Sequence, residues 1–150
     1  MDPDTDSVWA NRQNRSLFNL QEDEALSYAS FNRAIDPQDR ERVDQAVKSA
    51  MQSGERLLTE FRVAAPDGSV RWIHVRGRRL IDSGGNKIRL MGESVDVSKR
   101  KQMEKQLREQ LAEITDLKQQ LEKDNINLRK EIELQHVHED IVSRSSAMQR

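Results

Sequence analysis

Residues 57–97, LLTEFRVAAPDGSVRWIHVRGRRLIDSGGNKIRLMGESVDV, decide the fold. Apolar and polar side chains alternate in three runs of this stretch, and a period of two residues is typical of half-buried strands. The runs are separated by PDGS at 66–69 and DSGGN at 82–86, which contain residues that form tight turns and tolerate positive φ. The pattern predicts an antiparallel meander with helices covering one of its faces.

The clearest helix of the first half lies before the meander, at residues 36–52. Asp36 suits the N-cap and Pro37 the first helical position. Asp39 occupies the third helical position, where its carboxylate is expected to help satisfy free amides. Apolar residues then recur at helical spacing: Val43, Ala46, Val47, Ala50 and Met51.

The first 35 residues carry shorter patterns. DSVWAN at 6–11 is consistent with one strand, and NRQNRSLFNL at 11–20 with a brief helix. Trp9, Leu17 and Phe18 are the expected core anchors of this segment.

The last third of the chain is predicted to be one long helix, because no glycine or proline follows Val97. With Leu107 at heptad position d, most a and d positions are apolar. The expected seam comprises Leu107, Leu111, Ile114, Lys118, Leu121, Asn125, Leu128 and Ile132. A buried Asn125 favours a parallel two-stranded coiled coil, so the pattern predicts a homodimer. The alternative is a lone amphipathic helix folded back on the domain, with Leu117 widening its apolar stripe.

The composition limits the classes of partner. The net charge of -1 provides no overall field to attract nucleic acid or an anionic membrane. The sequence contains no cysteine, which excludes disulfides and cysteine-adduct photochemistry. No apolar run reaches the roughly 18 residues that a membrane-spanning helix needs. We therefore expect a cytoplasmic protein without a membrane partner.

The chain resembles the second half of a PAS domain in two stretches, IDPQDRERV at 35–43 and the run from EFRVAAPDGS to VDVSKRK at 60–101. RLMGESVDVSKRK at 89–101 is similar to the motif that ends this family. The resemblance implies a five-stranded antiparallel sheet, short helices across one face, a small internal pocket and a signalling helix. MDPDTDSVW at 1–9 resembles the family's second strand and the turn before it, so the first strand has no counterpart. Its absence would leave a sheet edge and part of the pocket open.

A weaker resemblance lies at the end of the chain. LRKEIELQHVHEDIVSRSSAMQR at 128–150 resembles the linker and opening of the AAA+ module of sigma-54-dependent activators, although Ser143 stands at the usual Gly and Ser146 at the usual Pro. The expected fold is thus α+β, with a PAS sensory domain at 1–97, a signalling coiled coil at 98–137 and the start of an output domain at 138–150.

The resemblances imply a sensing and dimerisation module that signals through the coiled coil to a sigma-54-type output domain. The alternatives are the sensory part of a histidine kinase or diguanylate cyclase, and a ligand-free structural dimeriser. No P-loop motif occurs in the sequence, so this chain is expected to have no enzyme activity of its own.

The expected functional residues form two groups. Signal transmission is assigned to Asp96, Val97, Ser98 and Arg100. Asp96 is expected either to pair with a strand arginine or to cap the helix beginning near Ser98. The pocket is assigned to Phe31, Phe61, Trp72, His74 and Met91.

The pocket's cofactor is not identified by the sequence, and a pocket filled by side chains is an equal alternative. Haem-binding PAS relatives carry their axial histidine on the long helix, where residues 36–52 have none, so haem is not expected. Noncovalent flavin stays open, as does a small-molecule ligand. His136 and His138 lie on different helix faces, which is poor geometry for a metal ion.

The arginines of the middle strand are expected to cover an exposed sheet face and pair with acids, rather than to bind nucleic acid. They are Arg71, Arg76, Arg78 and Arg79.

Overall fold

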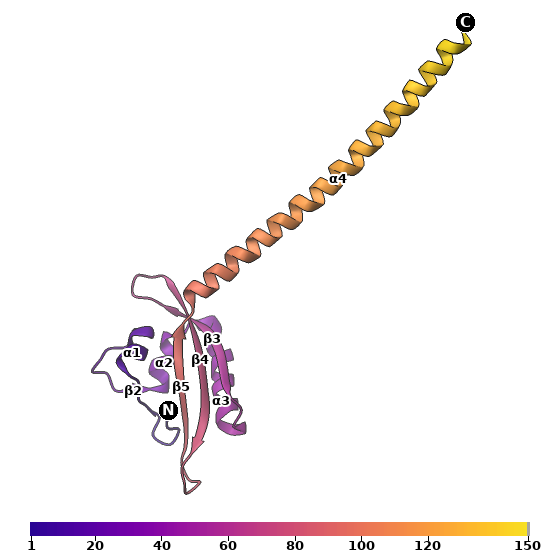
Figure 1. Cartoon of the computed structure of the whole chain (residues 1–150). Helices are drawn as coiled ribbons and strands as arrows, with labels where there is room; N and C mark the ends of the chain where they lie inside the picture. Colours follow the sequence, from indigo (N-terminus) through magenta and orange to yellow (C-terminus); the bar gives the residue numbers. More distant parts are fainter. Residues whose placement is uncertain (150) are drawn as a thin grey trace. The chain divides into compact units, whose positions relative to one another are not determined.

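Residues 1–149 are described by the computed structural model (Figure 1). The elements are, in order, β1 (Ser7–Val8), α1 (Arg12–Leu17), β2 (Leu26–Ser27), α2 (Tyr28–Ala34), α3 (Pro37–Ser53), β3 (Leu57–Ala64), β4 (Val70–Ile81), β5 (Ile88–Asp96) and α4 (Ser98–Met148). They divide into two compact units, Met1–Gln102 and a second that begins at Met103. The α+β class, with an antiparallel sheet, short helices and a long last helix, is confirmed.

The predicted meander is present as β3-β4-β5, with every neighbouring pair antiparallel. The first turn is closed by the Ala65 N–H, which donates to the Ser69 carbonyl at 2.8 Å, and has Gly68 at φ 81°. The second has Gly85 at φ 71°, a conformation that glycine adopts without strain. β1 and β2 pair separately, so the strands form a three-stranded sheet and a two-stranded ribbon instead of one five-stranded sheet.

Helix α3 begins as its sequence predicts. The Asp36 carboxylate accepts a hydrogen bond from the Gln38 N–H at 2.9 Å, and Pro37 opens the helix. Gly54 ends it in the left-handed region at φ 77°.

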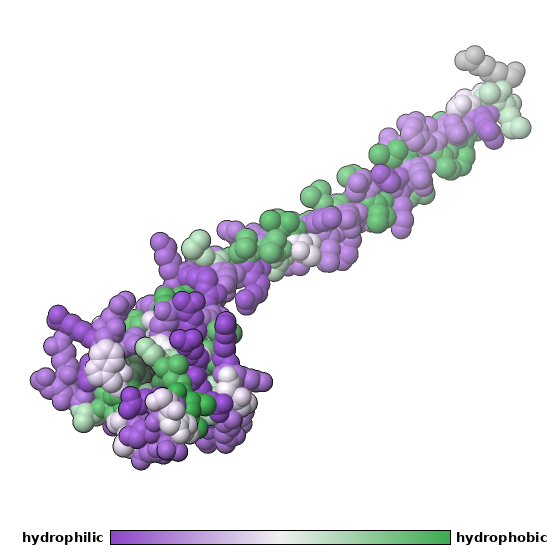
Figure 2. Space-filling model, turned by 60° about the horizontal axis from the view of Figure 1, so that its bottom comes forward, coloured by the Kyte–Doolittle hydropathy of each residue, from purple (hydrophilic) through white to green (hydrophobic). Residues whose placement is uncertain are grey.

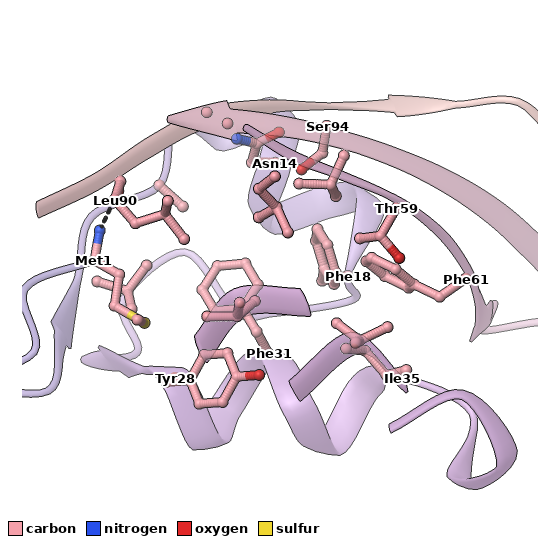
Figure 3. A pocket seen from close by; sticks show the side chains of 18 of the residues that line it. Met1, Asn14, Phe18, Tyr28, Phe31, Ile35, Thr59, Phe61, Leu90 and Ser94 are labelled. Carbon is pink, nitrogen blue, oxygen red and sulfur yellow. Dashed lines mark hydrogen bonds between the residues drawn. The ribbon is translucent and has the colours of Figure 1, made fainter. Parts of the chain in front are cut away.

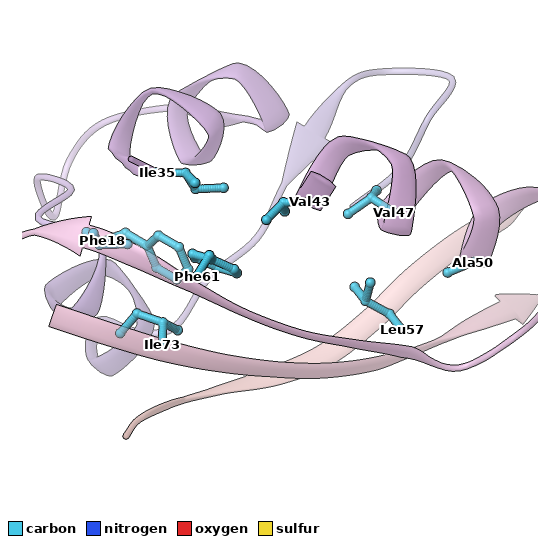
Figure 4. Packing of buried hydrophobic residues seen from close by; sticks show 9 residues of the cluster. Phe18, Ile35, Val43, Val47, Ala50, Leu57, Phe61 and Ile73 are labelled. Atoms are coloured by element: carbon cyan, nitrogen blue, oxygen red, sulfur yellow. The ribbon is translucent and has the colours of Figure 1, made fainter. Parts of the chain in front are cut away.

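The core lies between the helices and one face of the sheet (Figure 4). Its buried residues are Phe18, Ile35, Val43, Val47, Ala50, Leu57, Phe61, Val63 and Ile73. Phe18 is therefore a core residue, as predicted, and Leu17 packs partly buried against it. Trp9 is not a core anchor, because it is 84% exposed.

Among residues 1–149, the outer edge of β5 pairs with one residue only, Met1. Met1 and Leu90 exchange two backbone hydrogen bonds, of 2.8 Å from the Met1 amino group and 3.0 Å from the Leu90 N–H. No further described strand pairs with this edge, so β5 is an edge strand of the sheet.

Helix α4 runs without interruption from Ser98 to Met148. The helix therefore continues across the predicted boundary between the coiled coil (98–137) and the output domain (138–150), with no break between residues 137 and 138. No helix among residues 1–149 combines the length and the apolar character needed to cross a bilayer.

Candidate functional site

A cavity of about 160 Å³ lies between the sheet and the helices (Figure 3). Three aromatic rings from different elements help to enclose it. Phe18 meets Phe31 edge to face, with ring centroids 4.9 Å apart, and lies 5.9 Å from the ring of Phe61. Because the C-cap of α1, helix α2 and strand β3 each supply one ring, the shape of the cavity depends on how the helices pack on the sheet.

A few polar groups also face this mostly apolar cavity: Asn14, Tyr28, Thr59 and Ser94. The Tyr28 hydroxyl is buried and makes no hydrogen bond of ordinary geometry among the described residues, although the Asn32 and Asp44 side chains lie close enough to influence its pKa. Its burial raises the pKa of Tyr28. A ligand that can hydrogen-bond this hydroxyl would remove the cost of leaving it unpaired.

The size and lining of the cavity restrict what it can hold. An apolar cavity of about 150 Å³ accommodates a molecule the size of benzene. Neither histidine nor cysteine lines this cavity, so its walls offer no imidazole to a haem iron and no thiol to a flavin. The residues present fit a small, largely apolar molecule with one hydrogen-bonding group.

Two of the five predicted pocket residues, Phe31 and Phe61, line the cavity. Trp72, His74 and Met91 do not, because they lie on the opposite face of the sheet. The alternation along β4 is as predicted, but the inward face is the one that carries Ile73 and Val75.

The signal for the correct face was present in the sequence. Ile73 is fully buried, and Val75 lines the cavity. Each face of β4 carries two arginines, but those of the inward face, Arg71 and Arg79, lie near the ends of the strand, whereas its middle holds only Ile73, Val75 and Gly77.

The predicted transmission residues join the sheet to α4. Asp96 does both things expected of it: one carboxylate oxygen accepts from the Ser98 N–H at 2.9 Å, and the other lies 3.4 Å from the Arg71 Nε. The Ser98 hydroxyl accepts from the Trp72 N–H at 2.8 Å. The Val97 N–H donates to the Trp72 carbonyl, also at 2.8 Å. The start of α4 is thus fixed to β4 by backbone and side-chain bonds.

Glu60 on β3 is a second anchor for α4, one that was not predicted from the sequence. Its carboxylate lies 2.6 Å from the Lys101 Nζ and 3.2 Å from the His74 Nδ1, and it also accepts from the Arg100 guanidinium. The hydrogen bond from Lys101 is the main reason that the pKa of Glu60 is lowered to about 2. The Lys101 ammonium also lies 4.7 Å from the Trp72 ring centroid, a cation–π distance.

Asp39 fastens α3 to the sheet. Its carboxylate accepts 2.9 Å hydrogen bonds from the Arg62 backbone N–H, Nε and Nη2. The Arg62 side-chain bonds are the main reason that the pKa of Asp39 is lowered to about 2. The prediction that Asp39 serves the free amides of its own helix misses this larger role.

The described residues contain no group of three or more histidine, aspartate or glutamate side chains placed to hold a metal ion.

A cavity on one side of an antiparallel sheet, and the first turn of a helix anchored on the other side, define an α+β domain. The chain belongs to the PAS fold family, whose model matches residues 7–93.

Two curated sensor proteins are similar to this chain. Sensor protein FixL of Bradyrhizobium diazoefficiens is 34% identical over 94 residues, which cover 63% of this chain and 19% of that protein. A blue-light-activated histidine kinase of Brucella anthropi is 27% identical over 100 residues, covering 67% of this chain and 20% of that protein. The chain therefore spans about a fifth of the length of these relatives.

Solved structures show the same fold. A sensory box histidine kinase/response regulator from Burkholderia thailandensis has a TM-score of 0.61 and 29% identity, covering 75% of this chain and 85% of that one. The N-terminal domain of a diguanylate cyclase with a PAS/PAC sensor from Marinobacter aquaeolei has a TM-score of 0.58 and 22% identity, covering 67% and 93%. None of these four proteins is described as a sigma-54-dependent activator.

Proposed function

We propose that this chain is the sensory module of a signalling protein with a histidine kinase or diguanylate cyclase output, and that the module has no catalysis of its own. The kinase assignment is supported by the 34% identity to a sensor protein and by the similarity to two histidine kinases. The sigma-54-type output that the end of the sequence suggested has no support among these relatives. The histidine kinase or cyclase alternative replaces it.

The sensing role is supported by the alternation along β3 of residues that line the cavity and a residue that holds the first turn of α4. We call the contacts of Asp96 and Glu60 with residues 98–101 the joint. Thr59 and Phe61 line the cavity, and Glu60 between them holds Lys101 of α4 on the other face. A ligand that moves the backbone of β3 therefore moves the Glu60 carboxylate as well, because neighbouring strand residues share one backbone.

The middle strand repeats this arrangement. Val75 faces the cavity, and the neighbouring His74 lies 3.2 Å from Glu60. Trp72 is bonded to the start of α4 through both its N–H and its carbonyl. Two strands thus connect the cavity to the same helical turn.

Helix α4 supplies the element that transmits the change, as a parallel coiled-coil homodimer. The apolar residues of the seam are all more than half exposed in the single chain: Leu107, Leu111, Ile114, Leu121, Leu128 and Ile132. Figure 2 shows exposed apolar side chains among hydrophilic ones along this helix. The next core positions, Gln135 and Glu139, are polar, so the proposed seam ends with Ile132.

The sensing role is tested with phenol, a probe that matches the cavity in size and carries a hydroxyl for Tyr28. Phenol should bind saturably and change amide hydrogen exchange at residues 98–102, the first turn of α4. Val75→Phe, which fills the cavity, should abolish both effects while the circular dichroism spectrum stays folded.

Two results would contradict this role. One is binding that persists unchanged in Val75→Phe, which would place phenol elsewhere. The other is saturable binding in the cavity with no change at residues 98–102, which would favour a dimeriser that does not sense. Native mass spectrometry of the purified protein shows whether a small molecule is retained.

A further inference from the structure

A hollow lies on the sheet face opposite the interior cavity, and we infer that it binds a small organic anion. We call it the arginine hollow. It is lined by Arg56, Leu58, Arg76, Arg78, Met91 and Glu93, over the backbone of Gly77 and Gly92. Nothing in the proposed function uses this site.

The strand register brings the arginines together. Leu58 is paired with Arg76, and Arg78 with Met91. Leu57 is paired with Gly77, so continuing this register by one residue places Arg56 beside Arg78. Three arginines, one just before β3 and two in β4, therefore line one depression in the sheet.

The hollow has more positive charge than its own acid can neutralise. Arg76 pairs with Glu93, the one acidic side chain in the lining. Arg56 and Arg78 have no ion pair or side-chain hydrogen bond with any residue among 1–149. A guanidinium is planar and matches the two oxygens of a carboxylate or phosphate, so these two side chains favour an anion.

The other arginines of β4 show that this surplus is specific to the hollow. Arg79 donates to the Met51 and Gln52 carbonyls at the end of α3, both at 3.0 Å. Arg71 pairs with Asp96 at the joint. Both therefore have structural roles, in contrast to Arg78.

The apolar side chains in the lining indicate that the bound anion also has an apolar part. Leu58 and Met91 are each 63% exposed and stand beside the guanidinium groups. Burying their side chains against a ring or short aliphatic chain would add hydrophobic stabilisation to the charge attraction. The ligand class is therefore a carboxylate or phosphate ester attached to a small apolar group.

The floor of the hollow is also part of the wall of the interior cavity. Leu57, Gly77 and Gly92 line both spaces. Because neither glycine has a side chain, only a layer of backbone separates the two sites at this point. An anion in the hollow is thus placed to influence the cavity as a second input.

The test is an NMR titration with benzoate and with phenyl phosphate, using the uncharged benzamide as the control ligand. Benzoate and phenyl phosphate should shift the Met91 methyl and Gly92 amide signals saturably, and benzamide should not. The relative strength of the two anions separates carboxylate from phosphate ligands. Arg78→Gln should weaken binding about tenfold or more, and Arg56→Gln/Arg78→Gln further, because hydrogen bonds to charged groups contribute strongly.

Arg89→Gln is the matched control, since Arg89 is on the same sheet but outside the lining. It should leave the affinity within about twofold of the unmodified protein. Equal weakening by Arg78→Gln and Arg89→Gln would overturn the inference, because it would indicate general surface electrostatics. Equal binding of benzamide and benzoate would overturn it too. Phenol binding in the cavity is measured separately, so failure of one site leaves the other assignment testable.

Discussion

At the scale of single residues, two carboxylates hold elements together by staying ionised. The pKa of both Asp39 and Glu60 is lowered to about 2, chiefly by hydrogen bonds from Arg62 and Lys101 respectively. A carboxylate whose pKa is lower in the folded state stabilises the fold above its unfolded pKa, and this contribution is lost as the pH falls through the folded pKa. Acid therefore loosens the two contacts that attach α3 and α4 to β3.

We predict that the free energy of unfolding falls between about pH 4.5 and pH 2, with about 1–3 kcal/mol from each carboxylate. Urea denaturation at a series of pH values measures it. Asp39→Asn and Glu60→Gln should each flatten the pH dependence and lower the stability at pH 7. Unchanged slopes in both variants would show that the two ion pairs do not stabilise the fold.

Glu60 also allows a direct test of the anchor on α4. Glu60→Gln removes the charge that holds Lys101 and Arg100. Amide hydrogen exchange at residues 98–102 should accelerate by about three- to tenfold, while exchange in α3 stays the same. Glu55→Gln is the matched control, because Glu55 is exposed and has no ion pair with a described residue. Equal acceleration in both variants would remove Glu60 from the joint.

At the scale of elements, local patterns predicted what depends on neighbours in the sequence. The caps of α3 and the turns at 66–69 and 82–86 follow from short-range chemistry, and the meander follows from alternation. Alternation also says which residues share a face, but it does not say which face is inward, and Trp72 and His74 were placed on the wrong side for that reason. Glu60 was missed because its partner Arg100 is 40 residues away.

The β4–β5 pair depends on a close approach at Gly92. An added Cβ there would collide with the Arg76 carbonyl and lie 2.9 Å from the Gly77 Cα. We predict that Gly92→Ala lowers the free energy of unfolding by about 1–3 kcal/mol, because backbone atoms cannot move aside as a flexible side chain can. Urea denaturation measures the loss. Gly84→Ala in the β4–β5 turn is the control, because its Cβ would meet only side-chain atoms at 3.6 Å or more. Equal stability of the two variants would contradict the close approach.

At the scale of the whole molecule, the chain combines a domain that contains a cavity with a helix that leaves its apolar side chains exposed. An isolated helix gains little stability from propensity alone, and in the proposed homodimer a second copy would provide the burial that α4 lacks. In the proposed dimer, the contacts of Asp96 and Glu60 would fix the first turn of α4 in each copy. The proposed seam would begin further along the same helix, at Leu107.

The proposed coil makes a specific prediction about two asparagines of the same helix. Asn125 occupies a core a position, where a polar side chain favours two strands at a cost in stability, whereas Asn127 lies outside the seam. Asn125→Leu should raise the thermal stability of α4 and shift the protein toward higher oligomers in sedimentation equilibrium. Asn127→Leu should leave both unchanged, because the added apolar group stays in solvent. A monomer at tens of micromolar, or the same response to both substitutions, would contradict the parallel coiled coil and favour a helix that is covered in another way.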